Sequence, residues 1–208
     1  MLDISERPRK AHETISDWAR DAARVITIPV ASLLAHLGIH PNTVTLLGCV
    51  LSVGIAVLLA AGYISLGGWL LVVVAPLDAI DGALARLIGK ESQFGPFLDS
   101  TFDRISDMAL MIGVGIYYLQ QGAFIQVILV FLALAGGTLV SYVRARADAV
   151  GFSCKVGLLT RLERLVVLVV GLITEQVTIA LWVLAVGSIL TALQRIIHVY
   201  RLSLQNEP

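Results

Sequence analysis

The most regular feature of the chain is a succession of long apolar runs separated by short polar or glycine-containing turns. A helix needs about 20 mostly apolar residues to cross a bilayer. The pattern gives six candidate spans: 44–61, one from about residue 69 into the aspartate-containing stretch that follows, 96–119, 124–143, 158–173 and 177–197. Pro76 is expected to bend the second run, because proline interrupts helical hydrogen bonding. The pattern predicts an all-α integral membrane protein with six transmembrane helices.

The segment before the first run differs in character. Its first 24 residues are polar and mixed in charge, and between residues 15 and 37 apolar residues recur at helical spacing among charges. This spacing fits an amphipathic juxtamembrane helix at the membrane surface, and equally an ordinary packing helix, with Pro29 breaking or bending it. We therefore divide the chain into an N-terminal segment (1–40), a six-helix transmembrane domain (41–203) and a short polar tail (204–208).

Composition supports a membrane protein. Of 208 residues, 57% are hydrophobic and only 14% charged, and soluble domains rarely combine such values. The formal net charge is zero, so no general attraction to nucleic acid is expected. Cys49 and Cys154 show no metal-binding or redox spacing.

The basic residues are distributed unevenly between the two ends of the predicted bundle. The turns at 62–68, 120–122 and 174–176 fall on one side and contain no Lys or Arg. Cytoplasmic loops of membrane proteins are enriched in these residues. We expect a multi-pass protein of the cell membrane whose termini and polar motif face the cytoplasm.

Four aspartates form the most unusual feature of the apolar chain: Asp78, Asp81, Asp99 and Asp103. Residues three or four apart share a helix face, so each pair projects from one helix, and the polar turn 89–95 would bring the pairs face to face. Such carboxylates repel one another unless they bind protons or cations. Oxygen ligands suit Mg²⁺ or Mn²⁺, and two such ions commonly assist phosphoryl transfer.

Other residues of this stretch complement the aspartates. Gly82 lacks a side chain and would let a nucleotide approach the helix backbone. Arg86 lies four residues further on the same face and could hold a phosphate. Asp107 continues the face of Asp99 and Asp103, and we expect it to support Arg104.

The pattern D-x2-D-G-x2-A-R-x8-G-x3-D-x3-D is complete between residues 78 and 103 and resembles that of the CDP-alcohol phosphotransferases. Members of that family transfer a phosphatidyl-type group from a CDP-linked lipid, such as CDP-diacylglycerol, to an alcohol and release CMP. The resemblance implies that Asp78, Asp81 and Asp99 bind two Mg²⁺ or Mn²⁺ ions, and that Asp103 is the general base and also contacts a metal. It further implies contacts to the CDP-lipid from Asn42, Thr43, Thr45, Gly82, Arg86 and Ser92.

A basic set on the same side of the membrane points to the acceptor. It comprises Ser141, Arg144, Arg146, Arg161, Arg164 and Arg195. Arginines near a membrane surface pair with anionic groups, so this set favours a phosphorylated polyol as the acceptor substrate. Anionic lipid headgroups would also pair with these arginines. The segments 141–149 and 161–165 resemble those of prokaryotic phosphatidylinositol-phosphate synthases, although Leu162 replaces a common proline. In that branch the acceptor is inositol 1-phosphate, which implies phosphate contacts from Ser141, Arg144, Arg161, Arg164 and Arg195.

Several alternatives remain open at this point. A phosphatidylglycerophosphate synthase would use glycerol 3-phosphate, and an archaeal-type enzyme would use a CDP-linked ether lipid. An ion-coupled membrane carrier would also contain intramembrane carboxylates, but near the bilayer midplane. The family resemblance implies a homodimer. Gly136 and Gly137 would permit close helix contact, either between two copies or within one chain.

Overall fold

The structure is a computed structural model that describes residues 27–89 and 92–206, and this part contains helices and no strands. A helix over Thr27–His36 is followed by seven more. These are α2 (Pro41–Ala60), α3 (Ile64–Val74), α4 (Leu77–Leu87), α5 (Phe94–Gln120), α6 (Phe124–Ala149), α7 (Arg161–Ile173) and α8 (Val177–Asn206). Residues 15–26 of the predicted juxtamembrane helix lie outside the described residues.

Three described helices are long and apolar enough to cross a membrane: Pro41–Ala60, Phe124–Ala149 and Val177–Gln205. The count of six predicted from the sequence is therefore only partly matched. In place of the second predicted span the structure has two 11-residue helices, α3 and α4, separated by an interruption at Ala75 and Pro76. Helix α3 begins at Ile64, so most of the predicted turn 62–68 is helical. Helix α5 has 27 residues, but charged side chains occupy its first half, and α7 has only 13 residues.

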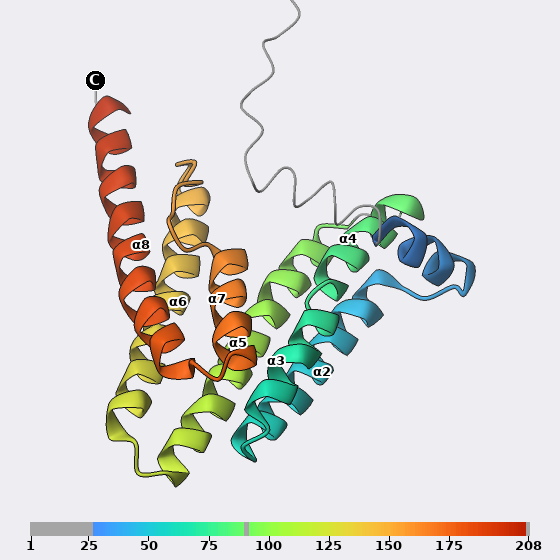
Figure 1. Cartoon of the computed structure of the whole chain (residues 1–208). Coiled ribbons are helices and arrows are strands. Elements are labelled where there is room, and N and C mark those ends of the chain that lie inside the picture. The colour runs from blue at the N-terminus through green and yellow to red at the C-terminus, as the bar shows by residue number, and fades with distance from the viewer. Residues whose placement is uncertain (1–26, 90–91, 207–208) are drawn as a thin grey trace, which may run out of the picture.

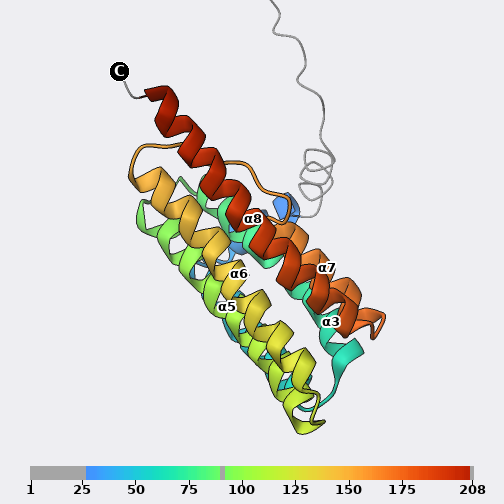
Figure 2. The same cartoon turned by 90° about the vertical axis from the view of Figure 1, so that its left-hand side faces the viewer.

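Helices α3 and α4 run in the same direction, one after the other, and the other successive helices from α2 to α8 alternate in direction (Figure 1). Helix α5 packs against α2 on one side and α6 on the other, α8 lies along α6, and α3 contacts α7. Figure 2 shows α8 running alongside α6, whereas Figure 1 shows α5 and α6 diverging from the turn that joins them. The turns that follow α2, α5 and α7 lie at one end of this bundle. We call the opposite end, where α4 ends and α5 and α7 begin, the site end.

Glycines allow the closest helix contacts. A Cβ atom added to Gly113 of α5 would lie 2.3 Å from the carbonyl oxygen of Ala56 on α2. A Cβ atom at Gly136 of α6 would lie 2.9 Å from the Cβ atom of Ser188 on α8. Of the two alternatives for Gly136, the structure thus shows packing within the chain.

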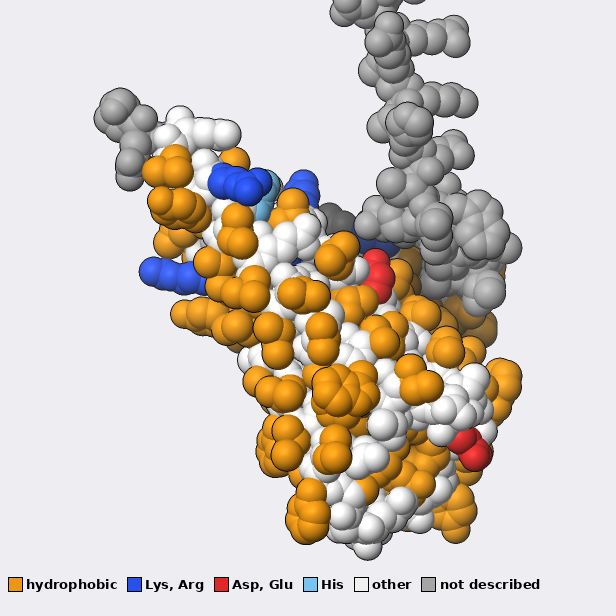
Figure 3. Space-filling model, turned by 60° about the vertical axis from the view of Figure 1, so that its left-hand side comes forward, with side chains coloured by type: hydrophobic (Ala, Val, Ile, Leu, Met, Phe, Trp, Pro, Cys, Tyr) orange, Lys and Arg blue, Asp and Glu red, His pale blue; other side chains and the backbone are white. Residues whose placement is uncertain are grey.

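The outer surface of the bundle is apolar. Val57, Val73, Ile125 and Phe131 are all more than 60% exposed. Hydrophobic side chains cover the body of the molecule, whereas Lys and Arg gather toward the site end (Figure 3). A large exposed apolar surface is typical of a membrane-embedded protein, because lipid replaces water around it.

Candidate active site

Local sequence signals position the helices of the site end. In α4, Asp78 lies in the first turn and Arg86 in the last, and both charges are favourable to the helix dipole. The hydroxyl of Ser92 accepts the backbone N–H of Gly95 at 3.1 Å and so caps the start of α5. Thr160 donates its hydroxyl hydrogen to the carboxylate of Glu163, three residues along, which fixes the start of α7.

A cavity of about 410 Å³, here called the aspartate cavity, opens between α2, α4 and the start of α5. Three of the four predicted metal ligands line it, Asp78, Asp81 and Asp99. Five of the six residues predicted to bind the CDP-lipid also line it: Asn42, Thr45, Gly82, Arg86 and Ser92. Thr43 is exposed and does not line the cavity. The helical hairpin inferred from the sequence therefore brings the three aspartates together with Gly82, Arg86 and Ser92, and α2 adds Asn42 and Thr45.

Asp81 and Asp99 are held differently within this cavity. Asp81 is only 6% exposed and accepts the hydroxyl hydrogen of Thr45, which is itself buried. The Oδ1 atom of Asp99 is buried and has no hydrogen-bond partner among the described residues. An unpaired buried carboxylate oxygen is costly, so a cation in the cavity would satisfy it.

In the described part of the chain, no three His, Cys, Asp or Glu side chains are arranged to hold a metal ion together. Arg161 instead pairs with two of the predicted ligands. Its Nη1 donates to Asp78 Oδ2 at 2.7 Å, and its Nη2 lies 2.9 Å from Asp103 Oδ1. Two of the predicted ligands are thus paired with a guanidinium. The unpaired oxygen of Asp99 and the all-carboxylate donor set nevertheless fit a hard divalent cation.

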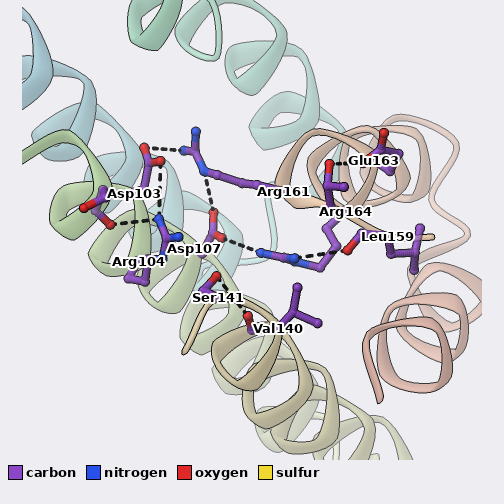
Figure 4. Close-up of polar contacts among 12 residues, drawn as sticks. Asp103, Arg104, Asp107, Val140, Ser141, Leu159, Arg161, Glu163 and Arg164 are labelled. Atoms are coloured by element: carbon purple, nitrogen blue, oxygen red, sulfur yellow. Dashed lines mark hydrogen bonds and ion pairs between the residues drawn. The ribbon is translucent and has the colours of Figure 1, made fainter. Parts of the chain in front are cut away.

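Asp103 and Asp107 belong to an ion-pair network that extends from α5 to α7 (Figure 4). Asp107 lies 3.5 Å from Nη2 of Arg164 and 3.8 Å from Nε of Arg161. Asp107 therefore pairs with two arginines of α7, and Arg104, its predicted partner, lies 3.5 Å from Asp103 instead. Helical side chains lean toward the N-terminus, so Arg104 reaches back to the carbonyl oxygen of Ser100 at 2.8 Å.

A second, smaller cavity of about 50 Å³ lies between α5, α6, α7 and α8, and we call it the arginine cavity. Its polar lining consists of Arg104, Asp107, Thr138, Ser141 and Arg164, and its floor is apolar. Ser141 and Arg164 were predicted acceptor residues, whereas Arg104 and Asp107 were not. The sequence offered one signal for these two residues. Asp107 lies on the same helix face as Asp99 and Asp103, and Arg104 was its expected partner.

The other predicted acceptor residues lie elsewhere. Arg161 is bound to the aspartates, as described above. Arg144 is exposed and lies 3.9 Å from Asp148, one helical turn away. Arg195 is only 3% exposed, and it donates to the carbonyl oxygens of Val140 at 2.6 Å and Val156 at 2.8 Å. Arg195 therefore ties the loop before α7 to the interior of α6.

Comparison with known proteins agrees with this geometry. Residues 38–194 match the CDP-alcohol phosphatidyltransferase family. The chain is 38% identical over 187 residues to the phosphatidylinositol phosphate synthase of Corynebacterium glutamicum, with 86% of this chain and 85% of that protein covered. It is 36% identical over 168 residues to the archaetidylinositol phosphate synthase of Pyrococcus horikoshii, with 80% and 87% covered.

Solved structures show the same fold. The crystal structure of Mycobacterium tuberculosis phosphatidylinositol phosphate synthase with CDP-DAG bound superimposes with a TM-score of 0.80 at 33% identity, covering 84% of this chain and 94% of that one. The same enzyme in complex with manganese and citrate gives a TM-score of 0.78 at 32% identity, covering 84% and 88%. The aspartate motif, the fold and these relatives together show that the chain is an enzyme of the CDP-alcohol phosphatidyltransferase family.

Proposed function

We propose that this enzyme transfers the phosphatidyl group of CDP-diacylglycerol to inositol 1-phosphate, forming phosphatidylinositol phosphate and CMP. The observation that carries the proposal is the aspartate cavity, where three motif carboxylates meet five residues suited to a cytidine diphosphate. Its volume of about 410 Å³ lies within the range of small-molecule sites. The relatives that make phosphatidylinositol phosphate support the choice of product.

The CDP half of the donor would bind along α4. Gly82 leaves the helix backbone open to the cavity, and Arg86 on the same face would pair with a phosphate of the pyrophosphate group. Asn42 and Thr45 close the cavity from α2, and Ser92 from the turn before α5. The mycobacterial structure with CDP-DAG bound supports a CDP-lipid as donor.

Asp78, Asp81, Asp99 and Asp103 would hold two Mg²⁺ or Mn²⁺ ions, and the manganese in the mycobacterial structure supports this. When bound, such ions neutralise phosphate charge and stabilise the departing CMP. Asp103 would accept the proton of the attacking hydroxyl. Thr45 would hold the Asp81 carboxylate in position through its hydrogen bond.

The acceptor phosphate would bind at the arginine cavity. Ser141 and Arg164 line it, and Arg144, Arg161 and Arg195 are the other predicted contacts. A guanidinium suits a phosphate monoester, whereas a neutral polyol would leave it unpaired. The archaetidylinositol phosphate synthase relative makes an ether-linked CDP-lipid a second candidate donor, because the motif residues contact only the CDP half.

The proposed setting is the cell membrane. We count α3 and α4 as one interrupted span, which with α2, α5, α6, α7 and α8 gives six spans and places the termini and the site end in the cytoplasm. The absence of Lys and Arg from the three turns at the opposite end supports this orientation. The family resemblance also leads us to propose a homodimer, which the mass of the purified protein in detergent would test.

The test of the catalytic assignment is the variant Asp103→Asn, assayed by CMP release from CDP-diacylglycerol with inositol 1-phosphate and Mg²⁺. An amide cannot accept the hydroxyl proton as a carboxylate does, so turnover should nearly disappear. Glu175→Gln is the matched control, because Glu175 is exposed at the opposite end of the bundle. Full activity of Asp103→Asn would refute the assignment.

A further inference from the structure

One arginine of α7 lies across the aspartates instead of lining the arginine cavity. The guanidinium of Arg161 bridges two helices: Nη1 contacts Asp78 on α4 at 2.7 Å, and Nη2 contacts Asp103 on α5 at 2.9 Å. Figure 4 shows its side chain extending from α7 toward Asp103 and Asp107. The side chain is 28% exposed, so the pairs are partly shielded from water.

These contacts give the carboxylates a positive partner. Asp78 and Asp103 would otherwise repel each other and the neighbouring Asp99. Hydrogen bonds between an arginine and carboxylates are among the stronger polar contacts, because both partners are charged. The bridge joins the carboxylates of Asp78 and Asp103. In addition, Nε of Arg161 lies 3.8 Å from Asp107. The arrangement therefore distributes one positive charge over three aspartates.

Two of these aspartates are the same groups that we propose as metal ligands. A carboxylate oxygen that accepts a hydrogen bond from a guanidinium is less available to a cation, and the positive charge of the guanidinium opposes a divalent ion nearby. We infer that Arg161 is the resident counterion of the metal-free aspartate cavity, and that it competes with divalent ions for the carboxylates of Asp78 and Asp103. This inference rests on the metal dependence in the proposed function.

If divalent ions displace Arg161 from the aspartates, its side chain must take up a second position. Metal ions that take over Asp78 and Asp103 release the guanidinium at the start of α7, one helical turn from Arg164. Arg164 already lines the arginine cavity. The released side chain can then join Arg164 in binding the acceptor phosphate, which makes metal loading a precondition for a complete acceptor site. On this inference the observed contact with the aspartates belongs to the metal-free protein, and the predicted phosphate contact would belong to the metal-loaded one.

The test measures Mn²⁺ binding to the full-length chain in detergent, with free Mn²⁺ followed by electron paramagnetic resonance. Arg161→Gln removes both the positive charge and the bridge, so it should bind Mn²⁺ about tenfold more tightly than the wild type, or about 1.4 kcal/mol. Unchanged or weaker binding by this variant would overturn the inference, since a purely structural or purely acceptor-binding arginine would not oppose the metal.

Two further Arg→Gln variants separate direct competition from general electrostatics. Arg164→Gln removes the same charge from the same helix, but its carboxylate partner is Asp107, at 3.5 Å. Arg201→Gln removes it from an exposed position on α8. We expect Arg164→Gln to tighten Mn²⁺ binding by less than about threefold, since its charge lies further from the metal ligands, and Arg201→Gln to leave binding unchanged. Equal tightening in Arg161→Gln and Arg164→Gln would refute a specific role for Arg161.

Arg161→Lys guards against a failure of the glutamine variant to fold. Lysine keeps the charge, but its point-like ammonium cannot bridge two carboxylates as a planar guanidinium does. The Arg161→Lys variant should bind Mn²⁺ more tightly than the wild type but less tightly than Arg161→Gln. Adding Mn²⁺ should also raise its unfolding temperature by more than it raises that of the wild type. If the wild type itself binds no Mn²⁺, the metal part of the proposed function fails. If the wild type binds but neither Arg161 variant binds more tightly, only the counterion inference fails.

Discussion

The contact between α2 and α5 provides a sharp test of the fold, because both helices pack closely together and both also line the aspartate cavity. A Cβ atom at Gly113 would lie 2.3 Å from the carbonyl oxygen of Ala56 and 3.0 Å from its Cα atom. Both are backbone atoms, so a Gly113→Ala variant can relieve the overlap only if the helices move apart. The shift needed is about 1 Å, the difference from an ordinary van der Waals separation.

Forcing an additional methyl group into a packed interface costs about 1–3 kcal/mol. Alanine recovers roughly 0.5–1 kcal/mol because it is a better helix former than glycine. Gly113→Ala should therefore lose about 1–2 kcal/mol of stability and lower the unfolding temperature in detergent by about 2–8 °C. A displacement of about 1 Å in the site can also reduce turnover as much as 100-fold. The rate of CMP release by Gly113→Ala should therefore be reduced even at temperatures at which the variant is still folded.

Gly54→Ala is the matched control. Gly54 lies on the exposed face of α2, and a Cβ atom there would have no neighbour within 4 Å among the described residues. This variant should be as stable as the wild type or slightly more stable. The reasoning about helix contact fails if Gly113→Ala unfolds at the wild-type temperature, or if both variants lose the same stability.

Three further substitutions test individual contacts. Thr45→Val removes the hydroxyl that positions Asp81. Loss of such a supporting group should reduce Mn²⁺ affinity or CMP release by about 10–100-fold. Wild-type values for both would contradict the role of Thr45 in positioning Asp81. Arg195→Gln removes the charged donor to Val156 and should cost about 1.5–3 kcal/mol of stability, read as a lower unfolding temperature and faster proteolysis of the loop before α7. Ser141→Ala should raise the KM for inositol 1-phosphate and leave that for CDP-diacylglycerol unchanged, whereas a rise in both would place Ser141 in the donor site.

The sequence was most informative where chemistry depends on local spacing. Residues three or four apart lie on one helix face in any helix, so the pairing of Asp78 with Asp81 and of Asp99 with Asp103 followed from position alone. The bend at Pro76 was predictable for the same reason, since proline acts on its own helix.

Contacts between distant segments could not be read from spacing. Arg161 lies 83 residues after Asp78, and only the packing of α7 against the rest of the bundle brings them together. Arg195 looked equally suited to a phosphate, yet its Nε and Nη1 atoms donate to two backbone carbonyl oxygens. A basic residue near a membrane surface has several possible anionic or carbonyl partners, and the tertiary structure selects among them.

The central claim is the transfer of a phosphatidyl group to a phosphorylated inositol. The most direct measurement is CMP release by the purified protein in detergent with CDP-diacylglycerol and Mg²⁺ or Mn²⁺, comparing inositol 1-phosphate with glycerol 3-phosphate and with Asp103→Asn as the control. We predict release with inositol 1-phosphate only, lost on chelation of the metal and in the variant. Release with glycerol 3-phosphate only would contradict the proposed acceptor, and release with neither would contradict the proposed reaction on this donor.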